Sequence, residues 1–364
     1  MNADPPAPPG PAAPGLESFP TSPLENLPFA FGAPPVQGEL RTEPEDFRVQ
    51  ELPVCEPEGS GEHVWLWVRK RNANTDWLAR QLARHAGVPA SQVSYAGLKD
   101  RDAVTEQWFS VHLPGAGEPD WKAFRCEGAA ILRHARHGRK LRRGALRGNR
   151  FNLRVRGVTG DAAALEERLE CIAARGVPNY FGPQRFGRGG ANLGAAQALF
   201  GGTLGRVDRH RRGLYLSAAR AWLFNLVLAA RVQDGSWERG MDGDVLQPDA
   251  SHGWFAPALG DPELDERLAN LEIHPTGPLW GRGGAPVSGR ALALETAVLE
   301  PWMLFRSGLE RAGMDQERRA LRLRVGELRW RREGDDLHLD FVLGRGAFAT
   351  AVLRELVAEA GNLD

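Results

Sequence analysis

The chain has 364 residues, which is long enough for two domains and a large hydrophobic core. Its 46 Lys and Arg residues balance 46 Asp and Glu residues, so any nucleic-acid binding must come from a local concentration of positive charge. The three cysteines lie far apart without a CxxC pair, which argues against a zinc site or a disulfide framework.

Residues 1–36 are rich in proline, alanine and glycine without periodicity, which predicts a mostly disordered leader. This segment lacks the basic and apolar regions of a signal peptide, and the chain contains no run of 18 apolar residues. We therefore expect a cytoplasmic protein that does not cross a membrane.

The first regular elements follow this leader. Residues 38–51 contain a short strand after a turn, and residues 63–69 alternate two kinds of side chain, which indicates a strand with two different faces. Thr75 is expected to cap a helix that ends at Gly87. The β-branched and aromatic residues at 105–113 predict another strand.

A charged turn at residues 97–101 reads Gly-Leu-Lys-Asp-Arg and lies just before the strand at 105–113. A loop on a rigid scaffold is a common place for a reactive group. Asp100 lies between Lys99 and Arg101, and two positive charges beside it would favour the ionised carboxylate that a nucleophile or base requires. The alternative is a solvated turn without a chemical role.

The segment 133–150 is strongly basic and contains no acid. Its eight arginines and lysines attract polyanions, which predicts contacts to successive phosphates of a nucleic acid. A solvated arginine-rich loop is the alternative. The candidate RNA-backbone contacts are Arg136, Arg139, Lys140, Arg142 and Arg143.

A strand is predicted at residues 151–156, and Phe151 at its start is either a core side chain or a ring for base stacking. A helix follows at 161–176. From about residue 177 to 318 the pattern changes to helices and loops, and strand alternation returns at 337–343. This order suggests that one domain is inserted into another.

Seven motifs occur in a fixed order along residues 38–360. Each motif alone is modest, but the ordered set is specific. They are Glu45-Asp-Phe-Arg-Val-Gln-Glu51, Ala96-Gly-Leu-Lys-Asp-Arg101 with Ala103-Val-Thr-Glu-Gln-Trp108, Gly144-Ala-Leu-Arg-Gly-Asn-Arg-Phe151, Val177-Pro-Asn-Tyr-Phe-Gly-Pro-Gln-Arg-Phe-Gly187, Leu216-Ser-Ala-Ala-Arg220, Asp242-Gly-Asp244 and Ala347-Phe-Ala-Thr-Ala-Val-Leu-Arg-Glu-Leu356. With these motifs the chain resembles the tRNA pseudouridine synthases of the TruD type. The resemblance implies an α+β fold. A catalytic domain with a mixed, mostly antiparallel sheet would cover 37–174 and 319–364, and an inserted α/β TRUD domain would cover 175–318.

The resemblance also implies an activity, the isomerisation of uridine to pseudouridine in tRNA, at position 13, without a cofactor or a metal ion. The catalytic aspartate of the family falls on Asp100. The implied substrate-binding residues are Phe47, Asn149, Phe151 and Phe348, with Lys99 beside the aspartate. The implied partner is tRNA, no protein partner is implied, and we expect a monomer.

The implied reaction breaks the N1–C1′ bond of uridine and joins C5 to C1′, which requires a carboxylate beside the ribose. That carboxylate can attack C1′, remove a sugar proton or add to C6 of the base, and the sequence does not choose between these roles. Reaching the base requires unstacking it from the RNA at a cost of a few kcal/mol. Phosphate contacts from residues 136–143 would offset that cost.

Two other functions fit part of the pattern. A non-catalytic RNA-binding protein would use the same basic segment and rings, but it gains nothing from a carboxylate near phosphates. A glycosidase-like hydrolase normally needs a pair of carboxylates. Asp102 and Glu106 are poor second candidates beside Asp100.

Overall fold

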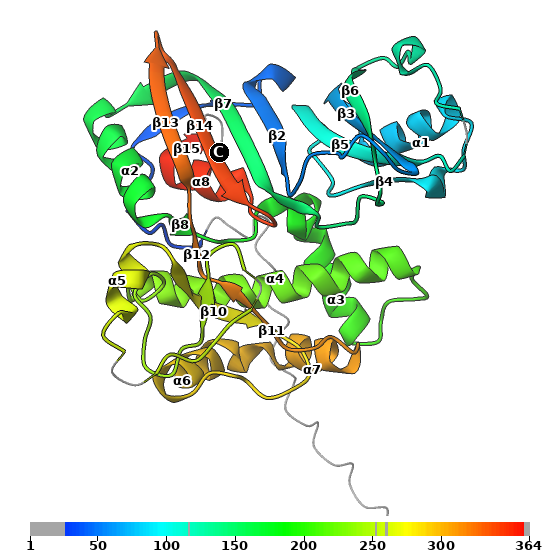
Figure 1. Cartoon of the computed structure of the whole chain (residues 1–364). Helices are drawn as coiled ribbons and strands as arrows, with labels where there is room; N and C mark the ends of the chain where they lie inside the picture. Colours follow the sequence, from blue (N-terminus) through cyan, green and yellow to red (C-terminus); the bar gives the residue numbers. More distant parts are fainter. Residues whose placement is uncertain (1–25, 116, 252, 259–260, 360–364) are drawn as a thin grey trace, which may run out of the picture.

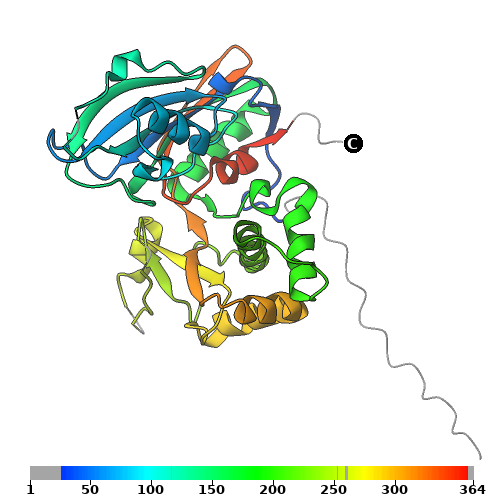
Figure 2. The same ribbon diagram turned by 90° about the vertical axis from the view of Figure 1, so that its right-hand side faces the viewer.

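The computed structural model describes residues 26–115, 117–251, 253–258 and 261–359. It contains a large sheet with its helices and a mainly helical second part (Figure 1). Figure 2 shows these two parts one above the other. The sheet has ten strands in the order β13-β14-β7-β2-β5-β3-β6, with β1 paired to β7, β15 to β1 and β4 to β5. Its strands are β1 (Val36–Leu40), β2 (Phe47–Pro53), β3 (His63–Arg71), β4 (Val93–Tyr95), β5 (Val104–His112), β6 (Ala129–His137), β7 (Leu146–Gly160), β13 (Gly326–Glu333), β14 (Asp336–Gly344) and β15 (Val357–Glu359).

Strand direction in this sheet is mixed. The pairs β2 with β5 and β1 with β15 are parallel. The other pairs in the sheet are antiparallel. The predicted α+β fold with a mixed, mostly antiparallel sheet is therefore confirmed.

Strand β7 shows how the alternating pattern directs the fold. Phe151, Leu153 and Val155 are buried in a core that also contains side chains of α2 (Ala162–Arg175) and α8 (Ala349–Leu356). The intervening residues Arg154 and Arg156 point to the other face, where they form ion pairs with acids of neighbouring segments. Successive side chains of a strand point to opposite faces, so one row fills the core and the other meets solvent.

The helix predicted after residue 74 is α1 (Thr75–His85), but its cap differs from the prediction. Asn74 Oδ1 accepts hydrogen bonds from the backbone N–H groups of Asp76 at 2.9 Å and Trp77 at 3.2 Å. Thr75 is buried, and its hydroxyl accepts a 3.2 Å hydrogen bond from the backbone N–H of Lys99. The predicted cap is thus wrong by one residue, because Thr75 supports the charged turn before β5 instead.

The second part lies between α2 and β13 in the chain. A three-stranded sheet in the order β11-β10-β9 packs with helices around a second core. The connections into and out of this part pair with each other as β8 and β12. This pairing supports our proposal of an inserted domain at 175–318. Strand β11 of the second part ends at Ala320, so the chain leaves this part a few residues after 318. The elements are β8 (Val177–Pro178), α3 (Ala191–Phe200), α4 (Arg209–Gln233), β9 (Leu246–Pro248), α5 (Leu264–Ala269), β10 (Ile273–Leu279), α6 (Gly289–Leu299), α7 (Met303–Arg311), β11 (Glu317–Ala320) and β12 (Arg322–Leu323).

Helix α4 is the central helix of the second core. By length and composition it is the one candidate membrane span among the described residues. Its side chains Leu223, Phe224, Val227 and Leu228 are all fully buried in the second core. An apolar helix surrounded by other elements is a core helix of a folded domain.

The predicted disordered leader is too long. Residues 1–25 lie outside the described part of the chain, but residues 26–35 pack against both parts. Leu27 is buried in the second core. Arg168 donates hydrogen bonds to the carbonyls of Phe31, Gly32 and Ala33, and Val36 begins β1. Proline-rich composition did not prevent order here, because α2 supplies donors for the backbone carbonyls.

The interior of the second part contains fully buried ion pairs. Arg231 and Asp244, from the Asp242-Gly-Asp244 motif, lie 2.6 Å apart with 1% and 2% of their side chains exposed. Arg318 and Glu295 lie 2.7 Å apart and are equally buried. Burial raises the pKa of Glu295, and Arg318 opposes that shift. Each charge is tolerated only because its partner remains in place.

Removing one member of such a pair should destabilise the protein strongly. We expect Asp244→Asn to lower the free energy of unfolding by about 3–5 kcal/mol, because the Arg231 charge stays buried without a counter-charge. Urea denaturation measures this change. The matched control is Asp315→Asn, which breaks the exposed Arg282–Asp315 pair and should cost about 1 kcal/mol or less. Equal losses for the two variants would contradict the argument.

Candidate active site

Asp100 and the five residues predicted around it line one cavity of about 110 Å³. Phe47 lies at the start of β2, while Asn149 and Phe151 lie near the start of β7. Phe348 caps the N-terminus of α8. The sheet register brings the two strands together, because Glu51 of β2 faces Asn149 of β7. The lining comprises Arg41, Phe47, Val49, Leu98, Lys99, Asp100, Asn149, Phe151, Gln184, Ala347, Phe348, Ala349 and Thr350.

Hydrogen bonds from buried polar side chains fix the backbone of the turn that carries Asp100. Lys70 of β3 is fully buried, and its Nζ donates a 2.6 Å hydrogen bond to the Asp100 carbonyl. Gln107 of β5, also buried, donates a 2.9 Å hydrogen bond to the Gly97 carbonyl. The Asp100 side chain itself remains 34% exposed. The backbone is therefore anchored while the carboxylate reaches the cavity.

Neither of the two cations predicted to flank Asp100 forms an ion pair with it among the described residues. Lys99 Nζ lies 2.8 Å from Glu51 Oε2, and both side chains are buried. The other oxygen of Glu51 accepts a hydrogen bond from the backbone N–H of Trp108. Arg101 is exposed. The Lys99 charge is therefore compensated by Glu51, so this lysine serves to hold the turn.

Arg41 is the cation that the sequence analysis missed. Its Nη2 lies 3.8 Å from Asp100 Oδ2, and its guanidinium lies 4.0 Å from the centroid of the Phe47 ring. Arg41 has a positive φ of 57°. That conformation is uncommon outside glycine and indicates that the surroundings fix the residue. An arginine six residues before Phe47 gives no local signal of this contact.

The aromatic residues of the cavity differ in accessibility. Phe47 and Phe151 are only 2% and 4% exposed and meet edge to face at 6.1 Å. Phe151 also stacks on Phe341 with ring centroids 5.4 Å apart. These two rings are therefore mainly core side chains with one edge at the cavity. Phe348 is less buried and is the better placed ring for stacking on a base.

Asn149, which lines the cavity, has an unused hydrogen-bond acceptor. Its Oδ1 is buried and has no hydrogen-bond partner among the described residues. Buried polar atoms are normally hydrogen-bonded, so an unpaired one in a cavity indicates a ligand or water contact. A side-chain amide offers both a donor and an acceptor, which suits the edge of a nucleobase.

The basic segment was predicted to lack counter-charges, and this is wrong in three dimensions. Arg136 lies on β6, forms an ion pair with Glu118 and donates hydrogen bonds to two backbone carbonyls. Arg143 stacks over Tyr95 at 3.7 Å and lies 3.9 Å from Asp76. The acids come from distant segments, which the local sequence cannot reveal. Arg139, Lys140, Arg142 and Arg143 are exposed outside the cavity, and their RNA contacts stay a prediction.

Asp100 is the one carboxylate in the lining of this cavity, counted over the part of the chain that the structure describes. Asp102 is exposed outside it, and Glu106 pairs with Arg69 and accepts a hydrogen bond from Trp67. The paired carboxylates of a glycosidase are therefore not assembled here. No cluster of three or more metal-ligating side chains occurs among the described residues.

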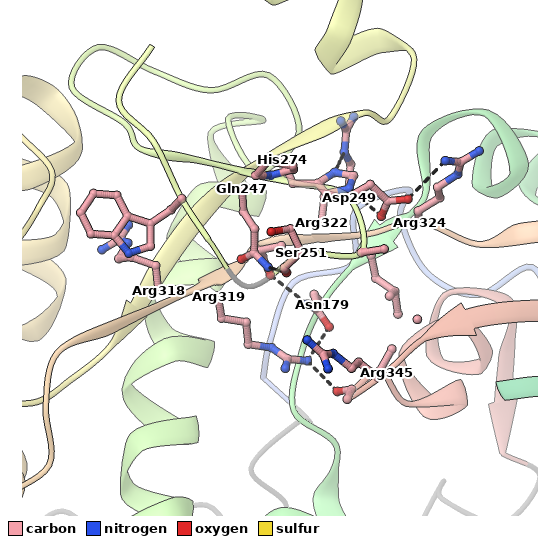
Figure 3. Close-up of a pocket in the computed structure, with 18 of the residues that line it drawn as sticks. Asn179, Gln247, Asp249, Ser251, His274, Arg318, Arg319, Arg322, Arg324 and Arg345 are labelled. Atoms are coloured by element: carbon pink, nitrogen blue, oxygen red, sulfur yellow. Dashed lines mark hydrogen bonds and ion pairs between the residues drawn. The ribbon is translucent and has the colours of Figure 1, made fainter. Parts of the chain in front are cut away.

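A larger cavity of about 520 Å³ lies beside the first and is lined from both parts of the molecule (Figure 3). It shares Ala347 with the cavity of Asp100. Asn179 accepts a 2.6 Å hydrogen bond from Arg319, and Gln247 Oε1 is buried without a partner among the described residues. Local sequence gives no signal of this cavity, because its arginines come from both parts. They are Arg147, Arg318, Arg319, Arg322, Arg324 and Arg345.

Comparisons with known proteins point to one family. The family model for tRNA pseudouridine synthase D (TruD) matches residues 24–196 and 191–356. A tRNA pseudouridine synthase D of Methylococcus capsulatus is 52% identical over 335 residues, which cover 92% of this chain and 95% of the relative. One of Pseudomonas putida is 49% identical over 341 residues, covering 93% and 96%.

Pseudouridine synthases are thus the class that these relatives define, and the chain belongs to the TruD family. The resemblance found in the sequence is confirmed. A solved structure from Methanosarcina mazei, assigned as a TruD protein, superposes with a TM-score of 0.72 at 21% identity. The superposition covers 92% of this chain and 97% of the Methanosarcina mazei chain, which supports the same fold.

Lys70 provides a pH-dependent test of the support beneath Asp100. Burial lowers the pKa of Lys70 from 10.5 to about 8. Between these values the unfolded chain binds more protons, so the contribution of Lys70 to stability rises as the pH rises. Relative to Lys70→Met, the free energy of unfolding of the wild type should therefore increase by about 2 kcal/mol from pH 7 to pH 10. Urea denaturation at both pH values measures the free energies of unfolding. The same difference between wild type and Lys70→Met at pH 7 and pH 10 would contradict a desolvated Lys70.

Proposed function

We propose that this protein is a tRNA pseudouridine synthase that isomerises uridine-13 of tRNA with Asp100 as its nucleophile. The observation that carries the proposal is the Asp100 carboxylate in a cavity with aromatic rings and an unused amide oxygen. The relatives named tRNA pseudouridine synthase D support the reaction and the RNA class. Position 13 rests on the family resemblance alone.

The net reaction is a rearrangement within one nucleotide. The N1–C1′ bond breaks, a C5–C1′ bond forms, and the proton on C5 is replaced while N1 gains one. No oxidant or co-reactant is required for this balance. Asp100 supplies the negatively charged oxygen, either at C1′ of the ribose or at C6 of the base.

The freed uracil must turn inside the cavity without escaping. We assign Phe348 as the ring that holds its face, since Phe348 is the more accessible ring of the cavity. Asn149 is assigned to the polar edge of the base, where its Oδ1 would accept the N3–H. Arg41 is assigned to stabilise the negative charge of the Asp100 carboxylate. Phe47, Phe151 and Lys99 complete the walls and hold this arrangement in place.

Binding of tRNA supplies the energy to extrude the nucleotide. Unstacking a base costs a few kcal/mol. Exposed cations outside the cavity, including Arg139 and Arg142, are assigned to phosphate contacts. We also propose that the protein acts as a monomer in the cytoplasm. A non-catalytic RNA-binding protein would use the same cations but has no need of Asp100 in the cavity.

The first test replaces the nucleophile. Asp100→Asn should leave tRNA affinity within about 3-fold of wild type and reduce product below detection, because an amide cannot act as the nucleophile. Pseudouridine is mapped by carbodiimide-dependent stops in reverse transcription. Asp102→Asn is the matched control, since this exposed carboxylate lies outside the cavity. Near wild-type turnover by Asp100→Asn would refute the proposal.

The second test concerns Arg41. Arg41→Gln should lower the single-turnover rate about 100-fold, because a positioned charge at the reacting group is lost. Affinity for tRNA should change little, and Arg41→Lys should keep most of the rate. Rapid-quench kinetics with filter binding separates these effects. A loss confined to affinity would make Arg41 an RNA contact rather than a partner of Asp100.

A further inference from the structure

Two arginines beside the candidate active site have no acidic partner in the described part of the chain. Arg185 donates a 3.0 Å hydrogen bond to the Ser217 hydroxyl. Arg319 of β11 donates to Asn179 Oδ1 at 2.6 Å and to the Gly346 carbonyl at 3.3 Å, as Figure 3 shows. All three acceptors are neutral. Neither guanidinium therefore has the carboxylate partner that Arg231 and Arg318 have inside the second part.

Both guanidinium groups lie against the same ring. Arg319 Cζ is 4.3 Å and Arg185 Cζ is 5.4 Å from the centroid of Phe181. Burial lowers the pKa of both groups, to about 9 for Arg319, where the charge of Arg185 adds to the effect. Two half-buried like charges beside one ring repel each other until an anion neutralises them.

Arg185 lies beside the cavity of Asp100, and Arg319 lines the larger cavity that shares Ala347 with it. A further cavity of about 210 Å³, lined by Arg185, shares Gln184, Phe348 and Thr350 with the cavity of Asp100. The guanidinium of Arg185 lies 5.8 Å from the centroid of the Phe348 ring. A group bound by Arg185 would therefore lie directly beside a base held by Phe348.

Two polar atoms at this junction have no hydrogen-bond partner within the described ranges. They are Arg319 Nε and Thr350 Oγ1, and both are buried. Each can donate a hydrogen bond. Unused donors next to two uncompensated cations indicate a site for an anion with several acceptor oxygens.

We propose that Arg185 and Arg319 bind one phosphodiester of the RNA, adjacent to the uridine that enters the cavity of Asp100. This inference rests on the proposed function, because it takes the uridine to be part of an RNA chain. The planar guanidinium forks match the oxygens of a phosphate, and the Thr350 hydroxyl adds a neutral donor. Extrusion of the nucleotide would then coincide with neutralisation of the pair.

A structural role for these arginines makes the opposite prediction for stability. A structural arginine stabilises the fold, so its loss lowers Tm. Loss of one of two uncompensated cations relieves repulsion and desolvation. Arg185→Met keeps a long side chain over Phe181, and its Tm in the absence of RNA should be unchanged or higher.

The main experiment measures tRNA affinity over a range of salt concentrations in the Asp100→Asn background, which prevents turnover. Arg185→Met and Arg319→Met should each weaken binding about 10-fold and reduce the slope of log K against log[salt] by about 0.7–0.9. Arg185→Lys should recover most of the slope, because it keeps the charge. Arg331→Gln is the control, since exposed Arg331 pairs with Glu333 and should leave the slope unchanged.

A second measurement locates the phosphate. Target tRNA is prepared with an uncharged methylphosphonate on the 5′ or the 3′ side of the target uridine. At one of these positions the substitution should weaken binding to protein with Arg185 but cause a clearly smaller loss with Arg185→Met, in which only Arg319 remains to contact that phosphate. Such non-additivity identifies the pair that interacts.

Several outcomes would overturn the anion site. These are additive losses at both positions, a salt slope unaffected by both variants, or a Tm of Arg185→Met lowered by several degrees without a change in slope. Stabilisation by inorganic phosphate without any methylphosphonate effect would indicate a free anion instead and also overturns it. A protein that binds no tRNA even with both arginines contradicts the proposed function itself, so the two failures are distinguishable.

Discussion

A fully buried lysine beneath the charged turn determines where Asp100 can lie. Lys70 Nζ donates a hydrogen bond to the Asp100 carbonyl, and Gln107 Nε2 donates one to the Gly97 carbonyl of the same turn. A cation without water around it must keep its acceptor, because an unpaired buried charge is costly. The backbone therefore cannot leave this position without stranding Lys70, and the carboxylate is directed into the cavity.

Charge compensation separates the supporting framework from the surfaces that face a ligand. Lys99 is neutralised by Glu51 under the turn, and Arg231 by Asp244 in the second core. Arg185 and Arg319 instead donate to neutral acceptors between the two parts. Paired charges hold the fold together. Arg185 and Arg319 lie where the two parts meet, and under the proposed function a long polyanion would contact both parts there.

The cavity depends on segments that are far apart in the chain. β2 and β7 supply its floor through sheet register, the turn before β5 supplies the carboxylate, and α8 supplies Phe348. Gln184 comes from the connection into the second part. The second part therefore contributes to the wall of the cavity, and under the proposed function the position of the uridine would depend on both parts together.

The sequence alone predicted the α+β fold, several of its strands and helices, and the five residues that line one cavity with Asp100. Period-two alternation in β7 and the family motifs carry that information locally. Only the tertiary structure decided which charges meet. Lys99 turned to Glu51 rather than Asp100, Arg41 approached Asp100 from an unmarked turn, and distant acids neutralised Arg136 and Arg143. Coulomb interactions depend on distance in space, and sequence spacing does not fix that distance for residues on different strands.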